Sequence, residues 1–279
     1  MRKKNIINLI SVLLSLGLLL SLLPKLNSDA SSEMVTMYVV SQIKRDDKSG
    51  DVSKLIYNKN GLLTKISMRD RTIRRKYKGK RIIEVSDSYS FTNNSYRYYY
   101  NSKDQVTKIT HTVKGTMGNN KYVSNYVDTF KYDSKNRLKN HTEKETKNDS
   151  SGVHIRSWKQ IFKYDKKNRI VKMKKTESGT GSIEIDTFTY DKTGNKISFV
   201  AKNGNNKLLM KATWSEYKRN KKGRVIWRKL YVSTPEFIKY KKIKVPKAYV
   251  DTVKQQQKAI VYDEITSYSI CFNPLGYFF

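Results

Sequence analysis

Hydrophobic and polar residues alternate with a period of two along much of the chain. Before Tyr164, the side chains of Trp158, Phe162 and Tyr164 share one parity, whereas Lys163 takes the other. This alternation is typical of a β-strand with one buried face. A short polar stretch follows Tyr164 and apolar residues resume at Ile170. The pattern therefore predicts a β-hairpin centred on the residues after Tyr164.

Variants of this unit recur, each anchored on a tyrosine that precedes turn-forming residues. The spacings between successive anchors are 20, 23, 32, 32, 26 and 27 residues. The anchors are Tyr57, Tyr77, Tyr100, Tyr132, Tyr164, Tyr190 and Tyr217. A recurring period is the signature of a repeat architecture. We expect seven hairpins over residues 53–232, hence about 14 strands in a meander, a number at which sheets curl or split.

The turns have a defined chemistry. In the unit at Tyr164, Asp165 is placed to cap the bend, and Asn168 is a residue type that accepts positive φ. This composition predicts a type I turn followed by a left-handed residue. After the turns, apolar residues stand three apart, as in Val106 and Ile109. Because three is not a strand period, we expect a β-bulge there or apolar contacts on both faces.

These units predict an all-β fold, an antiparallel meander of repeated β-hairpins that forms a large curved or barrel-like sheet, with a short C-terminal helix. The hairpins occupy a repeat domain at residues 31–232, opened by a strand at 34–44. Residues 233–279 form a cap, with a helix at 247–260 and one or two strands between Ile260 and Phe279. Residues 143–152 are interpreted as a polar connector between hairpins.

Residues 1–30 are a targeting segment. Arg2, Lys3 and Lys4 precede an almost wholly apolar run from Ile6 to Leu23. This arrangement indicates a secretory signal peptide or an uncleaved N-terminal membrane anchor, and both alternatives export the rest of the chain. The single cysteine, Cys271, predicts that the fold has no internal disulfide.

The tyrosine-centred segments resemble a known bacterial repeat. Tyr132-Asp133-Ser134-Lys135-Asn136-Arg137-Leu138 and Tyr164-Asp165-Lys166-Lys167-Asn168-Arg169-Ile170 resemble the YD repeat of the rearrangement-hotspot (RHS) family. That motif is Tyr-Asp-x-x-Gly-Arg followed by an aliphatic residue, so Asn136 and Asn168 replace the family's glycine. The resemblance implies strand-turn-strand units in a curved sheet, on secreted or cell-surface proteins of bacteria, with carbohydrate binding in some repeats.

The charge of the chain is strongly positive. It has 57 Lys and Arg residues against 24 Asp and Glu, a formal net charge of +33. Many cations fall in the turns, and a meander of hairpins brings those turns to one rim at intervals of about 10 Å. This interval matches the screening length of physiological salt, so the cations would act as one field. The predicted polyanion-binding residues are Lys135, Arg137, Lys166, Lys167, Arg169, Lys192, Lys196, Lys221, Lys222 and Arg224.

We therefore expect a secreted or cell-surface, non-enzymatic protein whose basic rim binds anionic polymers without sequence specificity. The expected partners are an anionic polysaccharide, a teichoic-acid-like polymer or extracellular nucleic acid. Alternatively, the lysines only protect strand edges from aggregation, and the chain is a structural or protein-interaction wall of a surface or secretion assembly. An outer-membrane barrel is disfavoured by Lys172, Lys174 and Lys175 within one strand.

Candidate chemistry is sparse. The histidines, His111, His141 and His154, are too scattered for a zinc site of standard spacing. No nucleophile, phosphate-loop or metal-binding motif is present, so we expect no enzyme, cofactor or metal, although carboxylate pairs for glycan cleavage need no motif. The tyrosines at 96, 98, 99 and 100 either pack across strands or form an exposed stacking row.

Overall fold

The computed structural model describes residues 33–90, 92–117, 120–190, 192, 196–213, 216–229 and 235–262. The chain divides into two units, Met1–Met34 and Val35–Phe279. The expected export segment at residues 1–30 lies outside the described residues, and so do residues 263–279. Among the residues described, no helix is both long enough and apolar enough to span a bilayer.

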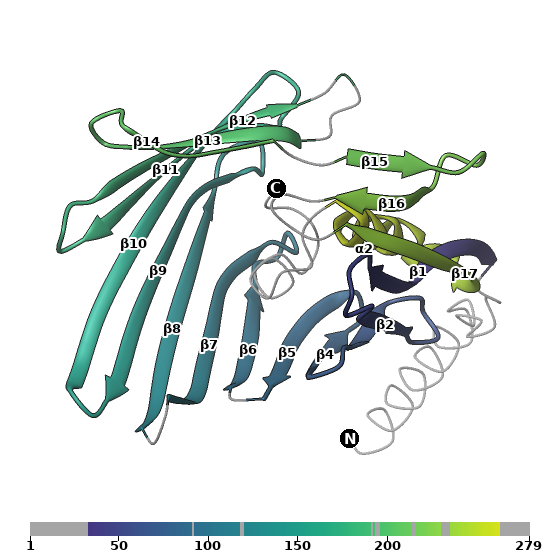
Figure 1. Cartoon of the computed structure of the whole chain (residues 1–279), viewed down its shortest axis with the longest axis horizontal. Coiled ribbons are helices and arrows are strands. Elements are labelled where there is room, and N and C mark those ends of the chain that lie inside the picture. Colours follow the sequence, from purple (N-terminus) through teal and green to yellow (C-terminus); the bar gives the residue numbers. More distant parts are fainter. Residues whose placement is uncertain are drawn as a thin grey trace, which may run out of the picture. The chain divides into compact units, whose positions relative to one another are not determined.

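The second unit is built on one antiparallel sheet of 17 strands, which is not closed (Figure 1). The strands are β1 (Met34–Arg45), β2 (Val52–Tyr57), β3 (Leu63–Ser67), β4 (Arg71–Lys78), β5 (Arg81–Tyr89), β6 (Thr92–Tyr100), β7 (Val106–Met117), β8 (Asn120–Tyr132), β9 (Leu138–Asp149), β10 (Gly152–Tyr164), β11 (Ile170–Ser178), β12 (Ile183–Tyr190), β13 (Lys196–Asn203), β14 (Leu208–Thr213), β15 (Glu216–Arg219), β16 (Val225–Lys229) and β17 (Glu236–Pro246). The all-β meander is confirmed. The sheet exceeds the expected size of about 14 strands because β1, β14 and β17 are added to the seven hairpins.

All seven expected hairpins form. Five anchor tyrosines are the last residues of β2, β6, β8, β10 and β12, Tyr77 is the last but one of β4, and Tyr217 lies in β15. At the β8–β9 turn, the backbone N–H of Asp133 donates to the carbonyl of Arg137 (2.8 Å), and that of Asn136 donates to Asp133 (3.0 Å). Asn136 has a φ of 60°. The expected left-handed residue at the end of the turn is thus confirmed.

A β-bulge follows each of these turns in which the register is fully described. At β6–β7, Tyr100 pairs with Val106, but the preceding Tyr99 pairs with Lys108, so Thr107 is the extra residue. Because one residue is inserted, Val106 and Ile109 both reach the face on which the anchor tyrosines lie. Both are buried. The spacing of three apolar positions is therefore explained by the bulge.

The hairpin turns share one edge of the sheet. Consecutive antiparallel pairing from β2 to β13 returns every second turn to the same edge. The β15–β16 turn joins them because β17 is antiparallel to β16 and starts at the other edge, where the carbonyl of Pro235 accepts from the N–H of Asp46 (2.7 Å). We call this shared edge the turn rim.

The face that carries the anchor tyrosines is the core face of the sheet. Ile73, Ile82, Val85 and Ile109 on this face are completely buried. Tyr96 and Tyr98 are each 5% exposed, so these two pack across strands. They do not form an exposed stacking row, which settles the alternative in favour of packing.

Helix α2 (Val250–Tyr262) follows a short 3₁₀ turn, η1 (Lys247–Tyr249). Its Val253 packs with Leu62 and Val245. Gly61, with a φ of +76°, makes this approach possible, since a Cβ there would lie 2.7 Å from Val245 Cγ2. The Gln256 side chain accepts a hydrogen bond from the backbone N–H of Leu63 (3.1 Å). The expected C-terminal helix is confirmed.

Two local predictions are wrong. Residues 143–152, expected to be a connector, belong mostly to β9 and β10, which turn at Ser150 and Ser151. Their polar residues alternate between the two faces of the sheet, so hydrophilicity gave a false loop signal. Residues 260–262 continue α2 and do not begin a strand. A strand does lie in the expected cap, but it is β17, before the helix.

Candidate functional site

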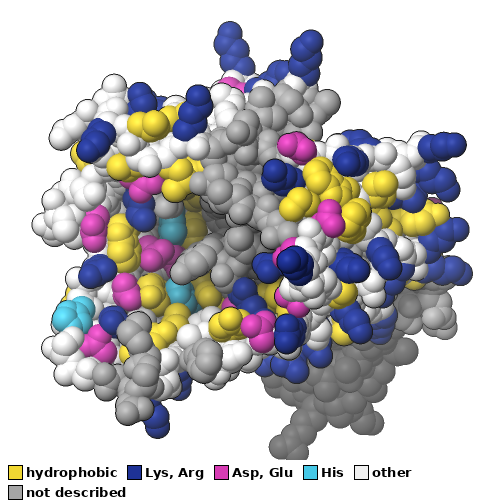
Figure 2. All heavy atoms as spheres, in the orientation of Figure 1, with side chains coloured by type: hydrophobic (Ala, Val, Ile, Leu, Met, Phe, Trp, Pro, Cys, Tyr) yellow, Lys and Arg dark blue, Asp and Glu magenta, His cyan; other side chains and the backbone are white. Residues whose placement is uncertain are grey.

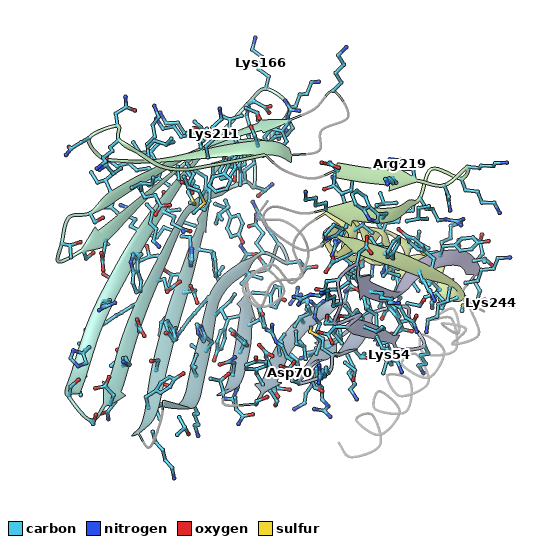
Figure 3. The ribbon with its side chains drawn as sticks, in the orientation of Figure 1. Lys54, Asp70, Lys166, Lys211, Arg219 and Lys244 are labelled. Carbon is cyan, nitrogen blue, oxygen red and sulfur yellow. The ribbon has the colours of Figure 1, made fainter. Side chains whose placement is uncertain are left out.

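The lysines predicted for the turn rim are exposed. Lys166, at the tip of the β10–β11 turn, points away from the strands (Figure 3). The other exposed lysines of the prediction are Lys135, Lys167, Lys192, Lys221 and Lys222. Lys196 is the first residue of β13, but its side chain lies outside the described residues. The structure thus places a row of accessible ammonium groups on the rim.

The side chains of the predicted arginines contact other residues of the protein. Arg137 forms an ion pair with Asp133 (2.7 Å) and lies over the ring of Tyr164, 4.6 Å from its centroid. Arg169 repeats both contacts one hairpin later, with Asp165 (2.6 Å) and with the ring of Tyr190 (4.6 Å). Each arginine therefore links its own turn to the next hairpin.

Arg224 lies over the ring of Tyr38 in β1, 3.4 Å from the ring centroid. Together with Arg137 and Arg169 it is already engaged within the protein, so these three guanidinium groups position the turns. The basic groups of the prediction that remain available to a ligand are the lysines.

Six of the anchor tyrosines, and Tyr240 of β17, connect neighbouring hairpins through their hydroxyl groups. Each of these hydroxyls donates to a backbone carbonyl of the preceding hairpin or strand, over 2.5 to 2.9 Å. The pairs are Tyr57 with Val40, Tyr77 with Leu63, Tyr100 with Ile82, Tyr132 with Val106, Tyr164 with Leu138, Tyr190 with Ile170 and Tyr240 with Val225. We call this series the tyrosine ladder.

The tyrosine ladder supplies hydrogen-bond donors to backbone carbonyls that lack a backbone donor in the sheet. Towards the turn rim, the pairing between β9 and β10 ends with Asn140 and Ile161. Leu138, two residues before Asn140 in sequence, therefore has no partner residue on β10. The hydroxyl of Tyr164 reaches the Leu138 carbonyl at this point (2.7 Å) and replaces the missing backbone donor. Burial raises the pKa of Tyr132 and that of Tyr164 to about 12, so both stay neutral donors at physiological pH.

The opposite face of β8 to β13 is rich in lysine, and we call it the lysine face. Its lysines are Lys121, Lys131, Lys144, Lys159, Lys163, Lys172, Lys174 and Lys202. Lys163 and Lys172 are directly opposite each other on β10 and β11. Like charges in such a pair destabilise a sheet.

Carboxylates are excluded from this face. In the described residues of β8 to β13, Asp128, Glu143, Glu145, Asp186 and the other acidic groups lie on the core face or in turns. No lysine of the lysine face forms an ion pair in the described part of the chain. In the described part of β8 to β13, the carboxylates therefore lie on one face, and the lysines of the opposite face have no carboxylate partner.

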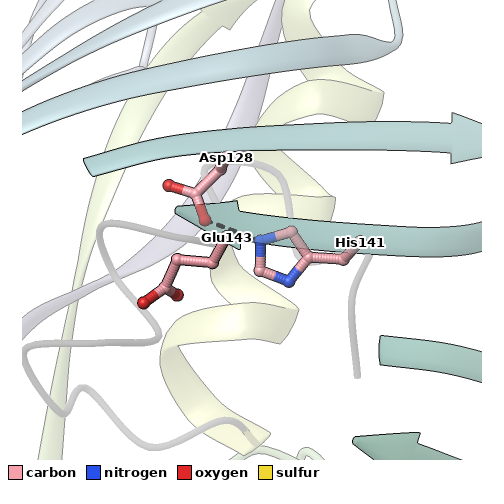
Figure 4. Close-up of side chains that lie close together, drawn as sticks. All are labelled: Asp128, His141 and Glu143. Atoms are coloured by element: carbon pink, nitrogen blue, oxygen red, sulfur yellow. Dashed lines mark hydrogen bonds and ion pairs between the residues drawn. The ribbon is translucent and has the colours of Figure 1, made fainter. Parts of the chain in front are cut away.

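The core face holds a cluster of Asp128, His141 and Glu143 (Figure 4). One potential ligand atom from each side chain lies within 4.8 Å of those of the other two. Asp128 on β8 is directly opposite Glu143 on β9, and His141 is two residues before Glu143. Figure 2 shows a hollow in which acidic and histidine side chains gather beside hydrophobic ones.

The ring of His141 is held on both sides. Its Nε2 lies 2.6 Å from Asp128 Oδ1, and its Nδ1 lies 2.8 Å from Gln160 Oε1. The ring also stacks on Phe130, with centroids 4.7 Å apart. A second histidine, His111, approaches the other carboxylate oxygen, with its Nδ1 3.9 Å from Asp128 Oδ2.

The electrostatics of the cluster are coupled. Burial and the neighbouring Asp128 raise the pKa of Glu143 to about 7. Burial opposes ionisation of Asp128, but the neighbouring imidazoles of His111 and His141 outweigh burial and lower the pKa of that carboxyl. Burial disfavours the charged form of His141, yet its contact with Asp128 raises the pKa of the ring. The group is thus suited to hold a proton or a cation between its ligand atoms.

The spacing of the histidines along the chain did not predict this cluster, because it reveals only metal sites whose ligands are close in sequence. His111 and His141 come from different hairpins and meet only through strand register. One signal was available. Once Tyr132 is taken as a hairpin anchor with a bulge after it, pairing places Phe130 opposite His141 and Asp128 opposite Glu143. His154, in contrast, sits near the other edge with Asp149, 3.7 Å away.

Comparisons with known proteins support the fold and do not identify a family. No family model matches the chain, and no curated protein matches it. A solved structure described as a porin-like protein from Bacteroides vulgatus ATCC 8482 is similar, with a TM-score of 0.51 and 9% sequence identity. The similarity covers 72% of this chain and 98% of that one. The resemblance of the turns to the YD repeat stays a prediction.

Proposed function

We propose that this chain is a secreted or cell-surface, non-enzymatic protein of YD-like β-repeats that binds anionic polymers through lysines. The ligand class is an anionic polysaccharide or a teichoic-acid-like polymer. The observation that carries the proposal is the lysine face, where the described residues of β8 to β13 place eight lysines and no carboxylate.

The spacing of these lysines suits a flexible polyanion. Neighbouring strands are about 4.8 Å apart and alternate residues about 6.6 Å apart, so the ammonium groups lie within one screening length of each other. Their repulsion, including that between Lys163 and Lys172, is relieved when an anionic chain lies across them. Lysine provides diffuse attraction, whereas the bidentate groups of Arg137 and Arg169 are used inside the fold.

The proposed location is supported by two independent features. The first is the charged start and apolar run of residues 1–30, which is the pattern of an export signal. The second is the fold similarity to a porin-like protein. Neither feature involves the lysine face, so export and polymer binding are separate parts of the proposal.

The binding test uses immobilised heparin as the polyanion. One variant changes Lys159, Lys163, Lys172 and Lys174 to Gln. A matched control changes Lys239, Lys244, Lys254 and Lys258 to Gln, and these exposed lysines lie on β17 and α2. Wild type and the control are expected to elute at similar salt, and the lysine-face variant at clearly lower salt. Equal elution of both variants would contradict the proposal, since only net charge would then matter.

A second function remains open because of apolar residues on the same face. Val153 and Ile155 of β10 are 64% and 63% exposed. They favour a structural or protein-interaction role in a surface assembly. Under this alternative, a protein partner is retained stoichiometrically in high salt and is lost when Ile155 is changed to Lys, while heparin retention is unaffected.

A further inference from the structure

We propose that Asp128, His141 and Glu143 form a binding site for a divalent transition-metal ion, with His111 as a further nitrogen ligand. The site lies on the core face, away from the lysine face, so it stands independently of the proposed function. Imidazole nitrogen with carboxylate oxygen is a donor set that suits Zn²⁺ and neighbouring metals better than Ca²⁺ or Mg²⁺.

The first argument is the orientation of His141. If Nδ1–H donates to Gln160 Oε1 (2.8 Å), the lone pair of Nε2 faces the Asp128 carboxylate at 2.6 Å. Two acceptors face each other at that distance only with a proton between them, and a metal ion could take the place of that proton once the two atoms move apart. A histidine ligand characteristically donates its other N–H to an oxygen in this manner. Stacking on Phe130 fixes the ring plane as well.

The second argument is the buried carboxylate. Asp128 is 0% exposed. Its Oδ2 accepts no hydrogen bond from the residues that the structure describes. It is directed towards His111, whose ring is stacked between Tyr96 (4.7 Å) and Tyr126 (4.0 Å). A buried carboxylate flanked by two immobilised imidazoles is costly in an apolar setting and is suited to a cation.

The third argument is the second acid. Glu143 stands opposite Asp128 in the β8–β9 ladder, and the pair places two carboxyl groups on one side of His141. Such neighbours repel when both are ionised, whereas a divalent ion stabilises both in the ionised form. Tetrahedral Zn²⁺ at about 2.0–2.2 Å from each ligand separates them by roughly 3.3 Å. The cluster therefore needs only small side-chain rotations to close around the ion.

The test measures Zn²⁺ binding to the full-length protein after treatment with a chelator. Calorimetry and metal analysis after dialysis are expected to give one Zn²⁺ per chain. Asp128→Asn, His141→Gln and Glu143→Gln should each weaken binding by at least about ten-fold. His154→Gln serves as the matched control, because His154 is also paired with an aspartate, Asp149, but in an exposed position. Its binding should equal that of wild type.

Two further readouts are made on the protein with all its proposed ligands unchanged. Zn²⁺ should raise the thermal midpoint of wild type in a concentration-dependent way, and equal concentrations of Mg²⁺ should not. Trp158 is directly opposite Glu143 on β10, so its fluorescence should change on Zn²⁺ addition, and Trp158→Phe should remove that change. Absence of stoichiometric Zn²⁺ in wild type, or equal loss in His154→Gln, would overturn the site and leave a proton-sharing network in its place.

Discussion

The tyrosine ladder predicts that removing the hydroxyl of a single ladder tyrosine measurably lowers the free energy of unfolding. In Tyr164→Phe the ring stays in place, and its stacking with Arg137 at 4.6 Å is retained. The change removes only the hydroxyl that donates to the Leu138 carbonyl over 2.7 Å. Because β9 and β10 are not paired at this position, no backbone N–H of β10 can donate to the Leu138 carbonyl in place of the lost hydroxyl.

The magnitude follows from burial. A hydrogen bond contributes about 1 kcal/mol net, and a buried acceptor left without a partner costs about 1–3 kcal/mol. Leu138 is 4% exposed, but the hydrogen bond that its carbonyl accepts from Tyr164 is only partly buried. We therefore expect Tyr164→Phe to lower the free energy of unfolding by about 1–2 kcal/mol. For a unit of this size, the thermal midpoint should fall by about 2–8 °C.

Urea and thermal unfolding, followed by circular dichroism and by fluorescence, measure the effect. Tyr99→Phe is the control, because Tyr99 is adjacent to an anchor but 45% exposed. The double variant Tyr132→Phe with Tyr164→Phe should lose the sum of the two single effects, since their hydroxyls bond to different hairpins. If Tyr164→Phe and Tyr99→Phe are indistinguishable, the ladder does not stabilise the sheet.

Three other predictions test the fold. Asn168 has a φ of 60°, so Asn168→Ala should destabilise by about 1 kcal/mol in urea unfolding and Asn168→Gly by clearly less, and the reverse order would refute the turn assignment. Buried Arg228 donates to the carbonyls of Ile260 (2.6 Å) and Val261 (2.8 Å) and pairs with Glu236. Arg228→Met should therefore cost about 3–5 kcal/mol, whereas a neutral result would mean that α2 docks without it. Finally, the raised pKa values of Tyr132 and Tyr164, about 12 against an ordinary value of 10, favour the neutral phenol in the folded state. Their contribution to stability should be complete below about pH 10 and lost as pH rises through about 12, a window that unfolding midpoints and phenolate absorbance can follow; normal tyrosine titration in the folded protein would contradict it.

The turns and hairpins could be predicted because their information is local. Tyr164, Asp165 and Asn168 fix an anchor, a cap and a left-handed residue within five positions. The same segment also sets the bulge, and with it the register of the following strand. Local chemistry of this kind repeats along the chain, so the meander follows from it.

Features that depend on distant contacts could not be predicted in the same way. Residues 143–152 are polar on both faces of the sheet, because one face carries the acid and histidine cluster and the other faces solvent. Burial of a hydrophobic face is the signal that sequence periodicity detects, and it is absent there. β17 was also missed. One of its pairing partners, β16, directly precedes it, but the other, β1, lies at the far end of the described chain.

The candidate site was predicted in part. The rim lysines are exposed as expected, but Arg137, Arg169 and Arg224 are engaged within the fold. Nothing local in the sequence says that Arg137 stacks on a tyrosine 27 residues later, because the length of the hairpin sets that meeting. The lysine face likewise emerges only when strand register assigns each lysine to a side.

The salt dependence of polyanion binding tests the central claim most directly. Heparin affinity of wild type should fall linearly on a double-logarithmic plot against salt concentration, with a slope of about −0.7 to −0.9 for each lysine contact. Changing Lys159, Lys163, Lys172 and Lys174 to Gln should reduce the steepness of that slope by about 3, and the matched changes on β17 and α2 should leave it as in wild type. An unchanged slope in the lysine-face variant would contradict the assignment of polymer binding to this face.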